Sequence, residues 1–135
     1  MAEELLTSPS ASNRAVTVRE NRQSLGPLLE AIVQVGPGAA PVVSLRGELD
    51  LAGADAFADL VLTVILSHGP DVVIDAAGLA FCDARGLGAL VRCANEARRT
   101  GGRLTLARPS HRLRRLMRVV DLDRLLYVAS VPEPR

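Results

Sequence analysis

The sequence predicts an α/β protein built on a mixed, mostly parallel sheet of about four to five strands. Two observations predict this class. Short apolar segments alternate with longer segments whose apolar residues recur every three or four positions, which is the pattern of strands alternating with amphipathic helices. The chain of 135 residues, 48% of them hydrophobic, is also long enough for one domain with a substantial core but not for two.

The first half of the chain is predicted to contain a tail, a hairpin and a helix. Residues 1–24 are rich in serine, asparagine, alanine and charge without strand or helix period, so we expect a flexible tail there and one domain over residues 25–131. Residues 29–35 and 42–46 are typical of two strands joined by a glycine- and proline-rich connection. A helix follows Asp50, because apolar residues recur there at intervals of three and four.

The second half alternates between strand and helix. A strand at 72–76 leads to a helix that begins at Asp83, a strand at 103–107 leads to a helix capped by Ser110, and a strand at 125–129 completes the order β-β-α-β-α-β-α-β. Two prolines among the last five residues leave any final helix short or absent.

The corner between the apolar strand and the helix that follows it is the most informative segment. Asp83 stands where a helix N-cap is needed, and its carboxylate can accept the free amides of the first turn. Such a corner also suits a phosphate or carboxylate. Arg85 places a positive charge in the same turn, which the helix dipole disfavours by roughly 0.3–1 kcal/mol.

Five ordered motifs follow one another along the chain: Gly47–Asp50, Val73–Asp75, Phe81–Leu90, Gly101–Leu104 and Val120–Leu125. Together they resemble the STAS domain, specifically the bacterial anti-sigma factor antagonists. The resemblance covers about residues 28–130, and it implies a sheet with its helices mainly on one face. It also implies a protein that binds an anti-sigma factor kinase, frees a sigma factor, and is switched off when the kinase phosphorylates it.

In that family the corner reads Asp-Ser-Ser-Gly-Leu-Gly, and the first serine accepts the phosphate. Here this position is Ala84, which has no hydroxyl, so the phosphorylation switch is not expected to operate there. Arg85 replaces the second serine; it is either a tolerated exposed residue or a contact to an acidic group on a partner or to an anion. By resemblance, we expect the anti-sigma factor to dock on Asp50, Asp83, Ala84, Arg85, Gly86 and Leu87.

Two other functions remain open. One is a STAS subunit of a lipid-transport or sensor complex, where the missing serine is expected, and the other is a nucleotide- or anion-binding sensor. We expect no enzyme, cofactor or metal, because no nucleophile completes a catalytic constellation with the carboxylates. Cys82, beside a helix N-terminus, is either a somewhat acidified redox thiol or a small buried apolar residue. Its spacing from Cys93 along the helix excludes an internal disulfide.

Charge is distributed unevenly along the chain, although the formal net charge is only +1. Residues 1–84 carry 4 arginines against 11 acidic residues, whereas residues 85–135 carry 12 arginines against 4 acidic residues. A basic C-terminal half can steer an acidic partner, but with three aromatic residues we expect no direct binding to nucleic acid. With two cysteines and no signal peptide or bilayer-spanning run, we expect a cytoplasmic protein without membrane insertion; the sequence does not predict its oligomeric state.

Overall fold

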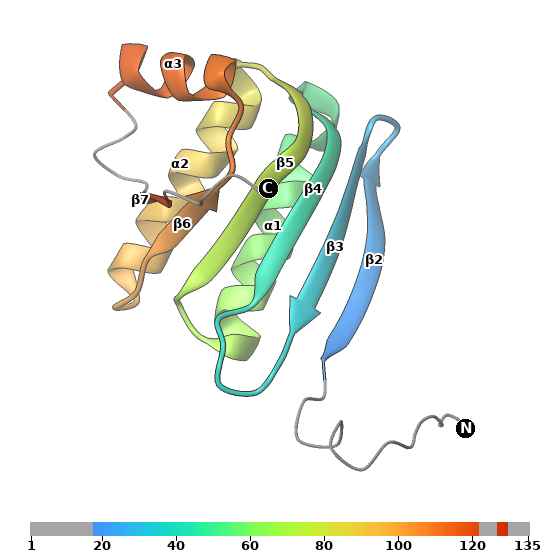
Figure 1. Cartoon of the computed structure of the whole chain (residues 1–135), viewed down its shortest axis with the longest axis vertical. Helices are drawn as coiled ribbons and strands as arrows, with labels where there is room; N and C mark the ends of the chain where they lie inside the picture. The colour runs from blue at the N-terminus through green and yellow to red at the C-terminus, as the bar shows by residue number, and fades with distance from the viewer. Residues whose placement is uncertain (1–17, 122–126, 130–135) are drawn as a thin grey trace, which may run out of the picture.

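The computed structural model of the chain describes residues 18–121 and 127–129. Within these residues the chain forms one six-stranded sheet in the order β2-β3-β4-β5-β6-β7, together with three helices (Figure 1). The elements are β2 (Arg19–Gly26), β3 (Leu29–Val35), β4 (Val42–Leu49), α1 (Leu51–His68), β5 (Val72–Cys82), α2 (Ala84–Arg99), β6 (Leu104–Ala107), α3 (His111–Val119) and β7 (Tyr127–Ala129).

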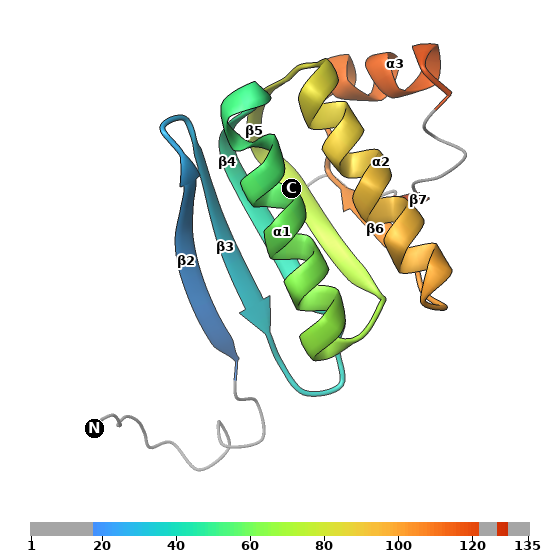
Figure 2. The same ribbon diagram turned by 180° about the vertical axis from the view of Figure 1, so that it is seen from behind.

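The sheet is mixed and mostly parallel, as predicted. β2, β3 and β4 pair antiparallel, whereas β4, β5, β6 and β7 pair parallel, with a helix in each parallel connection. The two views show that α1 and α2 cover the same face of the sheet, and that α3 lies at the end where β5 stops and α2 starts (Figures 1 and 2). The predicted class and the placement of most helical structure on one face are therefore confirmed.

The sheet contains one strand more than predicted, because β2 occupies residues that we assigned to the tail. The boundary at Ser24 is wrong for residues 19–24, while residues 1–17 lie outside the described residues. Almost all side chains of β2 are exposed, on whichever face of the strand they lie, so the segment shows no alternation of apolar and polar residues. Backbone pairing from Arg19↔Val35 to Gly26↔Leu29 holds the strand, and a hydrogen bond of 2.8 Å from Gln34 to Glu20 crosses the pair.

β5 is also longer than predicted, and this difference positions the corner. We expected the strand to end at residue 76, where alanine and glycine weaken the strand signal. Parallel pairing with β4 instead continues to Leu49↔Cys82, across two irregularities in the register. The last residue of β5 is therefore immediately before the N-cap Asp83. The predicted final strand is confirmed for residues 127–129, whereas its first two residues lie outside the described residues.

The core is aliphatic and lies between the sheet and the two long helices. Phe57 of α1 and Leu90 of α2 are buried against the sheet residues Leu49, Ile74 and Leu104. Burial of this apolar surface is the main source of stability in such a layer.

α1 is the one helix among the described residues that is long and apolar enough to cross a membrane, judged by length and composition only. It has 18 residues and a mean hydropathy of 1.4. One side of the helix contributes Phe57, Val61 and Ile65 to the core, and core helices pass the same test of composition.

Candidate functional site

The N-termini of α1 and α2 lie next to each other at the edge of the sheet that is formed by the C-terminal ends of the parallel strands, not by an outermost strand. α1 follows β4 and α2 follows β5, and these strands are parallel neighbours whose last residues are paired, Leu49 with Cys82. The amide of Asp83 donates to the carbonyl of Leu49 over 3.2 Å, which continues the pairing to the start of α2. Parallel strands bring their C-terminal ends to the same edge, and this edge is where ligands and partners of α/β proteins commonly bind.

One carboxylate joins the two helices at this edge. Oδ1 of Asp83 accepts a hydrogen bond of 2.9 Å from the amide of Gly86, so the predicted N-cap is confirmed. Oδ2 of the same carboxylate accepts a bond of 3.3 Å from the amide of Leu51, the first residue of α1. Asp50 caps α1 itself through a bond of 3.1 Å from the amide of Ala52. The link between Asp83 and α1 is long-range, and nothing in the sequence near either residue signals it.

These bonds also bear on the anion-sensor alternative. A phosphate binds a helix N-terminus through free amides in the first turn. Here the amides of Leu51, Ala52 and Gly86 already donate to carboxylates, and these carboxylates place negative charge at the same point. The geometry therefore does not favour an anion site between the two caps.

Gly86 allows α2 to approach β4 closely. A Cβ atom at this position would lie 2.3 Å from the carbonyl oxygen of Leu49 and 2.9 Å from the sulfur of Cys82, so no other residue fits without a backbone shift. Leu87 is buried in the core. Both were expected to belong to the docking surface, but both positions are buried, so they shape the corner from inside and offer little surface to solvent.

The exposed residues of the corner are Ala84 and Arg85, the first two residues of α2. They line a shallow groove between α1 and α2 whose floor is made of small residues, and Arg92 pairs with Asp55 across it at 3.1 Å. The side chain of Arg85 makes no ion pair or hydrogen bond with any residue in ranges 18–121 and 127–129. Its positive charge is thus available to a molecule that enters the groove.

Cys82 is half-buried below this corner, and its thiol is not acidified. Burial, and secondarily the negative charge of Asp83, raise the pKa of Cys82 to about 12. Of the two alternatives for Cys82, the raised pKa favours the small buried apolar residue over the acidified thiol, because Asp83 occupies the amides that would have stabilised a thiolate. Cys93 is fully buried with its pKa also raised to about 12, and both cysteines are free.

Exposed apolar side chains surround the corner, and sequence reasoning missed them. Leu51 begins α1 and is 62% exposed. Phe81 is opposite Glu48 in the register of β4 and β5 and is 43% exposed, and Leu28 lies close by because its carbonyl accepts from the amide of Glu48. The sequence did offer one signal for this exposed apolar surface, the large apolar residue Leu51 directly after the helix cap Asp50. No group of three or more His, Cys, Asp or Glu side chains within the described residues is placed to hold a metal ion.

Comparisons with known proteins agree with the resemblance found in the motifs. A family profile described as "Mlab, STAS domain" matches residues 32–127. No curated protein sequence is similar enough to the chain to count as a match.

Solved structures share the fold at low sequence identity. Unphosphorylated SpoIIAA, an anti-sigma factor antagonist of Bacillus, is 19% identical with a TM-score of 0.61, covering 76% of this chain and 89% of that one. An anti-sigma factor antagonist of Mycobacterium paratuberculosis is 19% identical with a TM-score of 0.62, covering 85% and 87%. The murine anion transporter Slc26a9 is 14% identical with a TM-score of 0.56; the match covers 85% of this chain but 21% of the transporter.

Proposed function

We propose that this chain, which belongs to the STAS domain family, is a non-enzymatic regulatory protein that binds an anti-sigma factor and thereby releases a sigma factor. The partner is a kinase-like anti-sigma factor, and the interaction takes place in the cytoplasm. Structural similarity to two anti-sigma factor antagonists supports this proposal, as does the order of the motifs around the corner.

The observation that carries the proposal is the corner itself. The carboxylate of Asp83 bonds to the amides of both helices, so the residues between the helix N-termini are held in a fixed arrangement. Ala84 and Arg85 stand exposed in this arrangement, and exposed apolar residues, Leu51 and Phe81, lie at the same edge. A preorganised surface of this kind loses little entropy when a partner binds.

Ala84 also determines how the interaction is regulated. An alanine methyl group cannot accept a phosphoryl group, and Arg85 supplies no hydroxyl either. We therefore expect an antagonist whose corner stays unphosphorylated, so that binding is set by the amounts of the partners.

A pull-down of candidate anti-sigma factors with the whole chain tests the proposal. Glutamate at Ala84 introduces both bulk and negative charge into the groove, and it is expected to weaken binding by about a hundredfold. Glutamate at the exposed Ala39, in the connection between β3 and β4 at the opposite end of the sheet, is the matched control and should leave binding unchanged. Capture of no anti-sigma factor by the unaltered chain would contradict the proposal.

A second function is favoured by two observations. The acceptor serine is absent at Ala84, and a region of an anion transporter has the same fold as this chain. Both are consistent with a STAS subunit of a membrane-transport or sensor complex. Co-purification with membrane-transport proteins, in place of an anti-sigma factor, would support this second function.

A further inference from the structure

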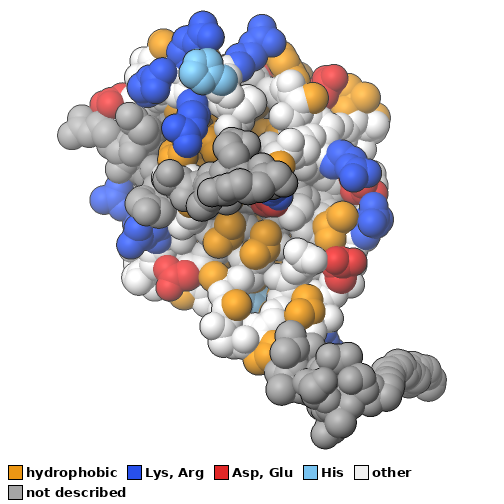
Figure 3. All heavy atoms as spheres, in the orientation of Figure 1, with side chains coloured by type: hydrophobic (Ala, Val, Ile, Leu, Met, Phe, Trp, Pro, Cys, Tyr) orange, Lys and Arg blue, Asp and Glu red, His pale blue; other side chains and the backbone are white. Residues whose placement is uncertain are grey.

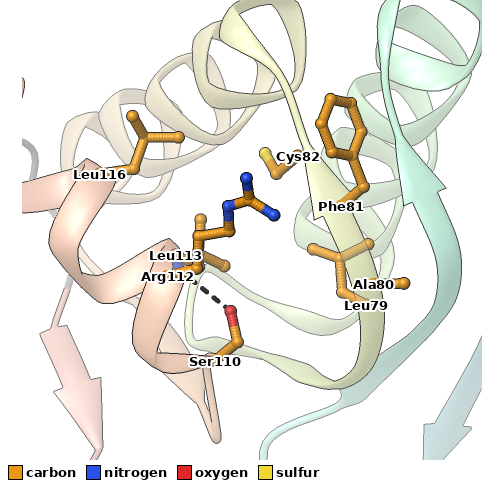
Figure 4. Close-up of a pocket in the computed structure, with 8 residues that line it drawn as sticks. All are labelled: Leu79, Ala80, Phe81, Cys82, Ser110, Arg112, Leu113 and Leu116. Carbon is orange, nitrogen blue, oxygen red and sulfur yellow. Dashed lines mark hydrogen bonds between the residues drawn. The ribbon is translucent and has the colours of Figure 1, made fainter.

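A second surface lies where the end of β5 meets α3, and Phe81 is the one residue that it shares with the proposed function. A small groove there leaves a volume of about 50 Å³ in which the centre of a water-sized molecule fits. Figure 4 shows that its walls come from the two elements, with Leu79, Phe81 and Cys82 on β5 and Arg112, Leu113 and Leu116 on α3.

The groove is apolar and partly open. Leu79 and Leu113 are buried and form its floor, Leu116 is half-buried, and Phe81 is 43% exposed. The hydroxyl of Ser110, which also lines the groove, accepts from the amide of Leu113 over 3.0 Å as the cap of α3 and is committed to that role. Exposed apolar walls of this kind gain free energy when an apolar side chain covers them.

The one charged side chain among the residues that line the groove is Arg112. In Figure 4 the guanidinium of Arg112 points across the groove toward Cys82 and Phe81. α3 has no acidic residue, and none of its four arginines has an ion-pair partner among the residues that the structure describes. Figure 3 shows the arginine and histidine side chains gathered at the end of the molecule that α3 forms. An apolar groove is thus bordered by uncompensated positive charge.

We propose that this groove binds an acidic amphipathic segment of a partner protein, which inserts an apolar side chain between Phe81 and Leu116 and places a carboxylate on Arg112. The groove selects the apolar side chain by burial, and the planar guanidinium binds the carboxylate through paired hydrogen bonds. The remaining arginines of α3 attract the acidic segment over a longer range. A nucleic acid fits less well, because it has no apolar group for the groove and would find a single aromatic ring to stack on.

A peptide selection tests this inference directly. A phage library of random peptides of about twelve residues is selected against the whole chain, and the enriched peptides are synthesised with a fluorescent label for anisotropy measurements. We expect them to carry Asp or Glu within about four residues of Leu, Ile or Phe. Arg112→Glu and Phe81→Ser should each weaken binding by about tenfold or more, whereas Arg98→Glu, an exposed charge reversal on α2, should leave binding within about twofold.

Several results would overturn the inference. These are the absence of any enriched peptide, enrichment of peptides without acidic residues, and binding that Arg112→Glu leaves intact. If a labelled oligonucleotide binds the unaltered chain and the Phe81→Ser variant but not an Arg114→Glu, Arg115→Glu variant, the basic surface would be assigned to nucleic acid instead. Sedimentation of the chain alone as a dimer that Arg112→Glu dissociates would assign the groove to a second copy of this chain. The Ala84→Glu variant should bind the selected peptides normally, which separates this inference from the proposed function.

Discussion

Replacing Asp83 by alanine removes two hydrogen bonds at once, because one carboxylate accepts from the amide of Gly86 in its own helix and from the amide of Leu51 in the neighbouring helix. Loss of an aspartate N-cap costs about 1 kcal/mol. The bond to Leu51 is long at 3.3 Å, so its loss adds about 0.5–1 kcal/mol. The expected decrease in the free energy of unfolding is therefore about 1.5–2 kcal/mol.

Two further variants separate these contributions. Asp50→Ala removes one capping bond, from the amide of Ala52, and should cost about 1 kcal/mol. Asp83→Asn keeps one carbonyl oxygen as an acceptor, so it retains the cap of α2 and loses the bond to α1, at a cost of about 0.5–1 kcal/mol. Asp83→Ala should therefore be the most destabilising of the three variants. Asp50→Ala should destabilise the fold as much as Asp83→Asn or more.

Urea unfolding followed by circular dichroism measures these differences. The midpoint should shift without a change in slope, because none of the variants alters the buried surface. If Asp83→Ala proves no more destabilising than Asp50→Ala, the carboxylate of Asp83 does not join the two helices, and the argument for a preorganised corner fails.

Three further predictions follow from the same region. Gly86→Ala should destabilise the fold by about 3 kcal/mol or more through the clash with Leu49. Gly88→Ala, with open space around it, should instead stabilise α2 by about 0.5–1 kcal/mol. Equal effects of the two variants on the urea midpoint would refute the close approach of α2 to β4 at Gly86. Iodoacetamide should modify Cys82 at pH 8 about a thousandfold more slowly than free cysteine, and mass spectrometry of labelled peptides reports the rate; a rate near that of free cysteine would contradict the raised pKa of this thiol. Cys82 and Cys93 have pKa values raised from 9.0 to about 12 in the folded state, so the folded chain holds these protons more tightly than the unfolded chain. The free energy of unfolding should therefore fall as the pH rises above 9, and it should fall less steeply in a variant with alanine at both positions. Identical pH profiles of the two proteins would contradict the raised pKa values.

Much of the fold could be predicted because its central elements bury one regular face. The strand at 72–76 and the apolar face of α2 have the periodicity of buried elements, and the structure places both in the core. β2 could not be predicted in this way, since an edge strand exposed on both faces lacks an apolar period and depends on pairing with β3. The extension of β5 to Cys82 depends likewise on pairing with β4.

At the candidate site, the local features could be predicted and the long-range ones could not. The cap by Asp83 follows from its position at the start of a helix. Its bond to Leu51 spans 32 positions in the sequence, and the elevated pKa of Cys82 depends on burial that only the packed structure shows. The basic helix α3 was visible as a run of arginines, but the apolar groove beside it requires the end of β5 to lie against that helix.

Whether the corner has lost its phosphorylation switch can be measured as the affinity of the chain for its purified anti-sigma factor before and after incubation with that factor and ATP. We predict that the unaltered chain takes up no phosphate at the corner and that its affinity is unchanged, because Ala84 has no hydroxyl. An Ala84→Ser, Arg85→Ser variant restores two hydroxyls and should take up phosphate and lose affinity. Loss of affinity by the unaltered chain, with phosphate on any residue of the corner, would show that the corner is still a phosphorylation switch.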